Sequence, residues 1–366
     1  MSSWIGFDSK HSLSQLSEEL TSKTATELAD LIRSRAVSPV EVIASHLERF
    51  ERMNPALNAI VTLADNAIDQ ARSAEVELTR GSEVGPLHGV PLTIKDTIDT
   101  AGLRTTSGSR LLAQNVPERD ATVVARLKAA GAIILGKTNT PEMAIPYETD
   151  NQVFGRTNNP HDLKRTPGGS SGGEAAAIAS CLSPAGLGSD LSGSIRVPAH
   201  FCGIAGLKPT TGRVPMDGHI PAASGPLSLG ACIGPMARSV DDLALLLKVI
   251  SNRTPSEAGA QSLTDQESRL SLAGLRVAAF IDKAAPVTEE TEAAIKSAAR
   301  ALSDAGASVS EETPPGFPDG SELWIELFSA AARDQLRDFY RGRESEAGPL
   351  VSTAIQRASA DKDEME

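Results

Sequence analysis

The chain has 366 residues, of which 40% are hydrophobic, and a formal net charge of -12, so a substantial core is expected that buries roughly three quarters of the unfolded surface. The acidic balance argues against a nucleic-acid partner, which would need clustered Lys and Arg, and three cysteines suggest neither a disulfide framework nor a metal site. No signal peptide or membrane-spanning run is recognisable, so we expect a soluble, cytoplasmic protein.

Helical spacing of apolar residues dominates the first part of the chain. Residues 24–35, 39–52 and 65–77 follow this pattern, and the short apolar run "LNAIVTL" precedes the third segment. The sequence therefore predicts an all-helical lead-in over about residues 24–80.

Alternation of strands and helices begins near residue 90. The runs "GVPLTI" and "AIILGK" predict buried strands on either side of a helix that ends at Gly131. The same alternation returns after the glycine-rich middle of the chain. It comprises a helix at 241–250, a strand at 274–282, a helix at 288–307 and an amphipathic helix at 323–336, and a polar tail follows.

These segments predict one α/β domain over residues 1–366. We expect its core at about 85–250 and a looser C-terminal part at 251–366, in which the polar residues 251–271 form a surface excursion.

Glycine and serine gather at residues 167–174, "PGGSSGGE". Gly168 and Gly173 have the spacing of a phosphate loop, but Glu174 stands where that loop needs a lysine. Gly169, Ser171 and Gly173 also satisfy the nucleophile-elbow pattern, although loop residues precede them instead of a strand.

The glycine-serine cluster could serve a histidine-dependent site or a purely structural purpose. The elbow would need a histidine base, and His200 and His219 are candidates, but His200 is expected in an ordinary loop as a structural residue. The glycines could instead serve tight turns while Ser170 or Ser171 caps the following helix, a role that is compatible with chemistry.

A longer set of motifs resembles the amidase signature family of serine hydrolases. "PGGSSGGEAAAIAS" and "GLGSDLSGSIRVPAHFCGIAGLKPTTGRVP" carry the resemblance, and "GVPLTIKDTID", "ILGKTNTPEMA" and "FGRTNNP" are similar to the flanking segments of that family. The resemblance is good over residues 24–250, looser to 307, and then fades.

This resemblance implies a catalytic triad without histidine. Ser194 would be the nucleophile, Ser170 the proton bridge, with a cis peptide bond before it, and Lys95 the base. A lysine can act as a base only if burial or neighbouring cations lower its pKa, and Lys95 ends an apolar strand where desolvation acts in that direction. In that segment alone, a lysine that extends to solvent is the more usual arrangement. Ser171 is expected in the hydrogen-bonding framework of the loop.

The second glycine-serine cluster is expected to stabilise the negative charge of the reaction. By resemblance, the backbone N–H groups of Leu191, Ser192, Gly193 and Ser194 form an oxyanion hole. Ser192 departs from the family pattern, in which a second glycine is frequent. Asp190 and Arg196 are expected to form an ion pair that supports the loop.

Substrate recognition is harder to predict. The segment "PEMAIPYE" resembles the wall of the acyl pocket, with Met143 and Ala144 as candidates, although a buried methionine more often fills a core. The loop "GHIPAASGPLS" is another candidate pocket segment.

Taken with the resemblance, the sequence predicts an α/β amidase-signature fold, a central mixed β-sheet flanked by helices on both faces. It would hydrolyse a small-molecule carboxylic amide through an acyl-serine intermediate, with no metal or organic cofactor. The glutaminase-type component of a tRNA-dependent amidotransferase, its A subunit, and a truncated, inactive scaffold are the alternatives. The chain is expected to be shortened at its C-terminus, and an exposed sheet edge could then drive homo-oligomerisation.

Overall fold

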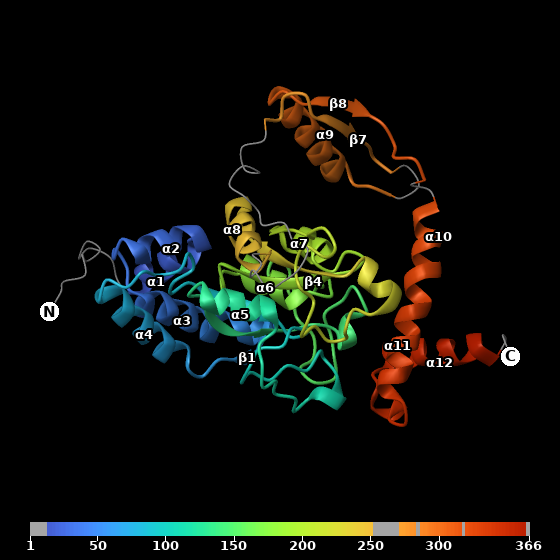
Figure 1. The fold of residues 1–366 in the computed structure, drawn as a ribbon, viewed down its shortest axis with the longest axis horizontal. Helices are drawn as coiled ribbons and strands as arrows, with labels where there is room; N and C mark the ends of the chain where they lie inside the picture. Colours follow the sequence, from blue (N-terminus) through green and yellow to red (C-terminus); the bar gives the residue numbers. More distant parts are fainter. Residues whose placement is uncertain (1–12, 252–270, 283–285, 317–318, 364–366) are drawn as a thin grey trace. The chain divides into compact units, whose positions relative to one another are not determined.

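The computed structural model describes residues 13–251, 271–282, 286–316 and 319–363 (Figure 1). Contacts divide the chain into two compact units, residues 1–260 with 331–366, and residues 261–330. A division by contacts does not test whether residues 1–366 fold as one domain, so that expectation stays a prediction. The segment 251–271, expected as a surface excursion, lies almost wholly outside the described residues.

A six-stranded mixed sheet forms the centre of the first unit, with the strand order β1-β3-β2-β4-β6-β5. Strands β3, β2 and β4 run parallel to one another, whereas β1, β6 and β5 pair antiparallel with their neighbours. The predicted central mixed sheet is confirmed. Its strands are β1 (Ile60–Leu63), β2 (Pro91–Lys95), β3 (Ile133–Thr138), β4 (Ala185–Asp190), β5 (Ala205–Gly206) and β6 (Cys232–Ala237).

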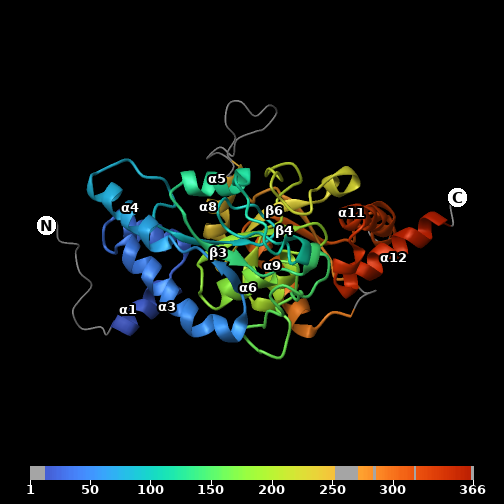
Figure 2. The ribbon, with the colours of Figure 1, turned by 90° about the horizontal axis from the view of Figure 1, so that it is seen from below.

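Helices cover both faces of this sheet. In Figure 2, α5 and α8 lie on one side of β3 and β4, and α6 lies on the other. The helices that precede the C-terminal segment of this unit are α1 (Leu13–Ser22), α2 (Ala25–Arg33), α3 (Pro39–Leu57), α4 (Ala67–Thr79), α5 (Thr122–Ala129), α6 (Gly172–Ala179), α7 (Arg196–Cys202) and α8 (Val240–Ser251).

Local sequence explains where the lead-in helices begin. Thr24 and Ser38 each form a capping box with a glutamate three residues later, and Pro39 occupies the first turn of α3. Asn58 ends α3 in the left-handed conformation. The lead-in is not all-helical, however, because the apolar run after α3 forms strand β1 and pairs with β3.

The alternation of side chains along β2 decides which face carries the polar groups. Leu92 and Ile94 belong to the main apolar core with residues of α2, α5 and α8. Thr93 and Lys95 therefore point to the opposite face, where α6 packs. This two-residue period places a buried lysine beside the glycine-serine loop.

The second unit contains a parallel strand pair, β7 (Arg276–Ala279) and β8 (Ser308–Glu311), with helix α9 (Glu289–Asp304) between them in sequence. It ends with α10 (Gly320–Trp324) and a π-helical turn, Ile325–Ser329. The predicted strand at 274–282 and helix at 288–307 are both present.

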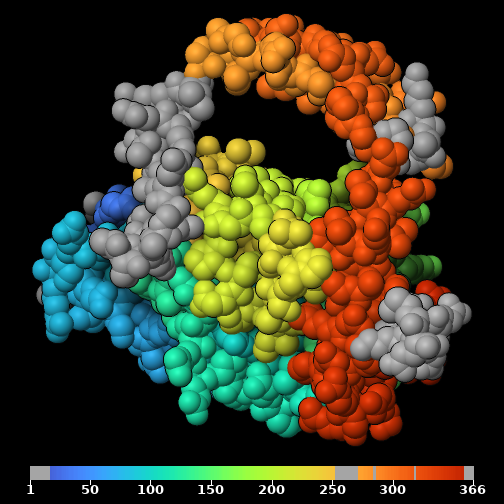
Figure 3. Space-filling view, turned by 45° about the vertical axis from the view of Figure 1, so that its right-hand side comes forward, coloured from blue at the N-terminus to red at the C-terminus, as the bar shows by residue number. Residues whose placement is uncertain are grey.

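The C-terminal segment of the first unit consists of α11 (Ala330–Tyr340) and α12 (Pro349–Asp363). Figure 3 shows α11 (red) against the segment near residue 225 (yellow), where Gln335 donates to the carbonyl oxygen of Ala222 at 2.6 Å. The polar tail was a wrong prediction, because α12 buries Val351 and Ile355 with Leu336 of α11.

Candidate active site

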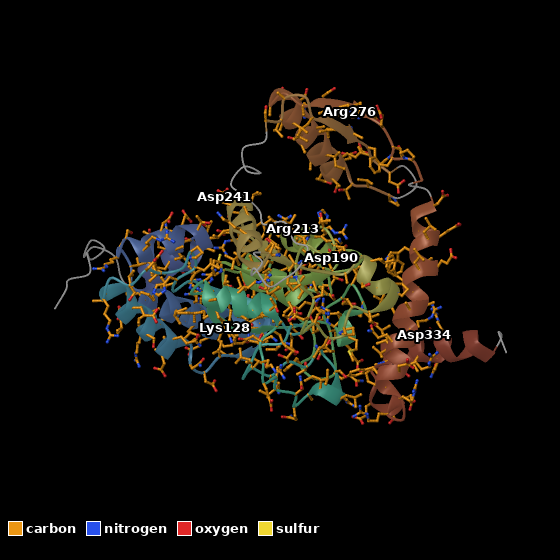
Figure 4. All side chains as sticks on the ribbon, in the orientation of Figure 1. Lys128, Asp190, Arg213, Asp241, Arg276 and Asp334 are labelled. Atoms are coloured by element: carbon orange, nitrogen blue, oxygen red, sulfur yellow. The ribbon has the colours of Figure 1, made fainter. Side chains whose placement is uncertain are left out.

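Three segments that are distant in sequence meet on the α6 face of the sheet. They are the end of β2, the glycine-serine loop before α6, and the turn between β4 and α7. Asp190, at the start of that turn, is labelled in Figure 4. The structure thus brings together the segments that carry Lys95, Ser170 and Ser194.

Lys95 is wholly buried, and its amine is held by two hydroxyl groups. The Nζ atom donates to Oγ of Ser170 at 2.6 Å and to Oγ of Ser189 at 3.0 Å. Burial lowers the pKa of Lys95 to about 7, although the carboxylates of Asp190 and Glu174 act in the opposite direction. The amine can therefore be neutral near neutral pH while it stays bonded to a serine.

The loop before α6 fixes Ser170 and Ser171 through different contacts. The peptide bond between Gly169 and Ser170 is cis, and Oγ1 of Thr140 donates to the carbonyl oxygen of Ser170 at 2.9 Å. Ser171 occupies the N-cap position of α6 without capping it. Its hydroxyl instead contacts the backbone of Ser189 at 3.3 Å, so the prediction that one of these serines caps the helix is wrong.

Ser194 lies next to this loop and keeps a small exposed area, 8% of its surface. Its carbonyl oxygen accepts a hydrogen bond from the N–H of Ser171 at 3.0 Å. Within the part of the chain that the structure describes, its hydroxyl has no hydrogen-bond partner. The structure therefore joins Lys95 to Ser170 directly, and joins Ser194 to the same loop through the backbone.

Asp190 organises the turn that carries Ser194. Its carboxylate receives two hydrogen bonds from the Arg196 guanidinium, at 2.8 and 3.0 Å, so the predicted ion pair is present. It also accepts from the N–H groups of Gly193 at 2.7 Å and Ile195 at 3.0 Å. Burial alone would raise the pKa of Asp190, but these hydrogen bonds outweigh it and hold the pKa below its usual range.

These contacts bear on the predicted oxyanion hole. The N–H of Gly193 points to Asp190 and is already engaged. The N–H groups of Leu191, Ser192 and Ser194 have no acceptor among the described residues. Of the four predicted oxyanion donors, these three N–H groups are free to bind an acceptor in the described structure, whereas that of Gly193 is not.

Tyr147 also binds this turn, and no pattern in the sequence singles it out. Its hydroxyl donates to the carbonyl oxygen of Ser192 at 3.0 Å and contacts the Ser192 hydroxyl at 2.8 Å. The extra side chain at Ser192 is thus used in a link to the loop at 141–148. Because Tyr147 is half-exposed, it lies at the outer rim of the site.

Met143 and Ala144 both adopt left-handed backbone conformations in the same loop. The Met143 side chain is buried in an apolar cluster with Leu336 and Tyr340 of α11 and with α12. This placement agrees with core filling, the more usual role of a buried methionine. Ala144 is only partly buried.

The two candidate histidines make no hydrogen bond to the serines among the described residues. His200 is in helix α7, not in the expected loop. His219 is partly buried. Desolvation of its ring lowers its pKa to about 4, and its Nδ1 is hydrogen-bonded to the carbonyl oxygen of Pro221. Neither ring is hydrogen-bonded to Ser170, Ser171 or Ser194 within the described residues.

Ser189 and Glu174 are further residues whose place near Lys95 was not foreseen. The sequence signal for Ser189 is its position next to Asp190 in the second glycine-serine cluster. Over the described ranges, no group of three or more His, Cys, Asp and Glu side chains could hold a metal ion. In the same ranges, no helix has the length and apolarity to cross a membrane.

The fold and these contacts define a class of protein: an α/β protein with a buried lysine–serine pair beside a second serine that keeps a small exposed area. The sequence profile of the Amidase family matches residues 41–365. The chain belongs to this family, and the predicted family and fold are confirmed.

Individual relatives agree with this assignment. The A subunit of the glutamyl-tRNA(Gln) amidotransferase from Sulfurihydrogenibium sp. (strain YO3AOP1) is 46% identical over 246 residues, which are 67% of this chain and 50% of the relative. The chain therefore spans about half the length of the relative that it matches there.

Solved structures give the same result. A 6-aminohexanoate cyclic dimer hydrolase in complex with substrate superposes with a TM-score of 0.80 at 31% identity, over 93% of this chain and 72% of that one. A vestigial protein complex described as revealing the origins of an s-triazine catabolic enzyme has a TM-score of 0.83 at 32% identity, over 92% of this chain and 74% of that chain.

Proposed function

We propose that this protein hydrolyses a carboxylic amide to a carboxylate and ammonia or an amine, through an acyl intermediate on Ser194. The observation that carries the proposal is the wholly buried Lys95 amine, 2.6 Å from Oγ of Ser170, in a chain of the amidase family. A buried amine with a pKa of about 7 can accept a proton at neutral pH.

In the first half of the reaction, Oγ of Ser194 attacks the amide carbon. Its proton passes to Oγ of Ser170, whose own proton moves to the neutral amine of Lys95. When the carbon–nitrogen bond breaks, the proton returns through Ser170 to the leaving nitrogen, which departs as ammonia or an amine. Water then attacks the acyl-Ser194 ester with the same proton relay and releases the carboxylate.

Negative charge on the substrate oxygen needs donors that are free in the resting enzyme. The N–H groups of Leu191, Ser192 and Ser194 are the available ones, and each such donor typically contributes about 3 kcal/mol to lowering the barrier. Asp190 and Arg196 hold the turn in place. Met143 and Ala144 remain candidates for the acyl-pocket wall. Met143 would support that wall indirectly, because its side chain packs in the apolar cluster with α11 and α12.

The A subunit of a tRNA-dependent amidotransferase is the second candidate. It is favoured by the curated relative from Sulfurihydrogenibium, which carries that name. In this case the amide would be glutamine, and partner subunits would be needed to use the ammonia.

Ammonia and carboxylate release from an amide panel tests the proposal. We expect the wild-type chain alone to hydrolyse simple aliphatic or aromatic amides, and the Ser194→Ala variant to lose this activity. Glutamine hydrolysis that requires added partner subunits would favour the second candidate. No hydrolysis in either setting would leave the inactive scaffold as the description of the chain.

A further inference from the structure

Glu174 is a buried carboxylate that the proposed reaction does not use. It lies in the first turn of α6, is wholly buried, and accepts hydrogen bonds from Oγ1 of Thr93 at 2.5 Å and from Oγ1 of Thr138 at 2.7 Å. Thr93 belongs to β2 and Thr138 to β3. One carboxylate therefore connects the helix that follows the glycine-serine loop to two central strands.

The sheet is shaped to admit this side chain. A Cβ atom at Gly186 in β4 would collide with Oε1 of Glu174. Burying a carboxylate is costly even when it is hydrogen-bonded, and an apolar residue in its place often does no harm to stability. A packing role alone is therefore a weak reason for a glutamate at this position.

Charged groups around the site give the carboxylate a second role. Lys95 of β2 and Lys137 of β3 both interact electrostatically with Glu174. Lys95 also interacts with Asp190 at the end of β4 and with the partly buried His219. Burial raises the pKa of Glu174 to about 7, against the effect of the threonines and lysines, and its negative charge in turn raises the pKa of Lys95.

We propose that Glu174 is a positioning residue for Lys95. Its carboxylate holds α6 against β2, and its negative charge makes the lysine amine less ready to give up its proton. The inference rests on the proposed function, in which Lys95 is the base. The hydrogen bond from Thr93 connects the carboxylate to β2, the strand that carries Lys95 two residues further on. The charge favours the protonated amine, so it moves the activity toward higher pH.

The Glu174→Gln variant tests this role. Glutamine can keep both threonine contacts but removes the charge, so the pKa of Lys95 should fall by about one unit. Its titration is measured by NMR of the lysine side-chain carbons, with the Lys95 signal assigned by its loss in Lys95→Ala. The acid limb of kcat/KM should move to lower pH by the same amount.

Glu142→Gln is the matched control. Glu142 is also a buried glutamate with two hydrogen-bond donors, the hydroxyl of Tyr340 and the N–H of Gly348, but Lys95 is not among the groups that influence its pKa. Its substitution should leave the Lys95 titration unchanged. An unchanged Lys95 pKa in Glu174→Gln, or an equal shift in the control, would overturn the inference.

A second variant, Thr138→Val, tests the same role if Glu174→Gln does not fold. Thr138→Val keeps Glu174 and removes one donor to its carboxylate, so the carboxyl is neutral over a wider pH range and the pKa of Lys95 should fall by a smaller amount. No shift in that variant would also count against the inference. Because the NMR titration needs no turnover, a shifted pKa in an enzyme without amidase activity would refute the proposed function alone.

Discussion

At the scale of single residues, the protonation of Lys95 decides the expected pH dependence. Only the neutral amine can accept a proton, and burial places its pKa at about 7. The kcat/KM for amide hydrolysis should therefore rise with pH and level off above about 7. A pH–rate profile measures this directly, and an acid limb near the ordinary lysine value of about 10 would contradict it.

In the proposed reaction, the side chain of Ser170 carries the proton between Ser194 and Lys95. Ser170→Ala should lower kcat by roughly 10²- to 10⁴-fold, the usual contribution of a proton-transfer group, and should leave the thermal unfolding transition nearly unchanged. Ser183→Ala is a suitable control, because that buried hydroxyl donates to the backbone of Ala185, away from the proposed relay. Equal turnover in the two variants would rule out the relay.

Also at this scale, the link between Tyr147 and Ser192 should affect catalysis. Tyr147→Phe removes both contacts of the tyrosine hydroxyl with Ser192, so the turn that carries the free N–H groups loses a restraint. We expect kcat to fall by about two- to tenfold with little change in KM, as for the loss of one or two ordinary hydrogen bonds. A rise in KM at constant kcat would indicate a substrate contact instead.

At the scale of elements, the sequence predicted the lead-in helices and the strands β2 and β3, because helical apolar spacing and short apolar runs are local signals. Strand β4 was not recognised. Its glycines hide the strand pattern, and they are there for non-local reasons: Gly186 leaves room for Glu174, and a Cβ at Gly188 would lie 2.8 Å from Oγ of Ser171.

The contact of α11 with the loop at 141–148 gives a prediction for stability. The Tyr340 hydroxyl bonds Glu142 at 2.7 Å and Ser109 at 2.6 Å in a buried site. Tyr340→Phe leaves both partners incompletely satisfied and should cost about 1–3 kcal/mol in the free energy of unfolding. Urea denaturation measures it, and the half-exposed Tyr147→Phe, which should change stability by less than about 0.5 kcal/mol, is the control. Equal losses of unfolding free energy in the two variants would contradict a stabilising role for the buried Tyr340 hydroxyl.

At the scale of the whole molecule, the resemblance predicted the family and the mixed sheet, because long motifs in order are specific. The C-terminal end was predicted poorly. Helix α12 has few apolar residues, and its Val351 and Ile355 gain a partner only when α11 and Met143 come together. The hydrogen bonds of Lys95, Ser170 and Ser189 are likewise set by tertiary packing and have no local signature.

A buried lysine should also lower the stability of the molecule as a whole. Because the folded pKa of Lys95 is depressed to about 7, the unfolded chain binds the proton more readily between pH 7 and about 10, and this contribution to stability rises with pH over that window. Lys95→Met should abolish turnover, raise stability at pH 7, and reduce the slope of stability against pH. Chemical denaturation between about pH 7 and pH 10 measures this, and an unchanged slope would contradict a desolvated amine.

The most direct test of the account is intact mass measurement after treatment with a fluorophosphonate probe, followed by peptide mapping. The wild type should gain one adduct, on Ser194, at neutral pH, while Lys95→Ala and Ser170→Ala should react far more slowly although they remain folded. Labelling at another serine, or equal labelling rates in all three proteins, would contradict the central claim that the buried amine activates Ser194 through Ser170.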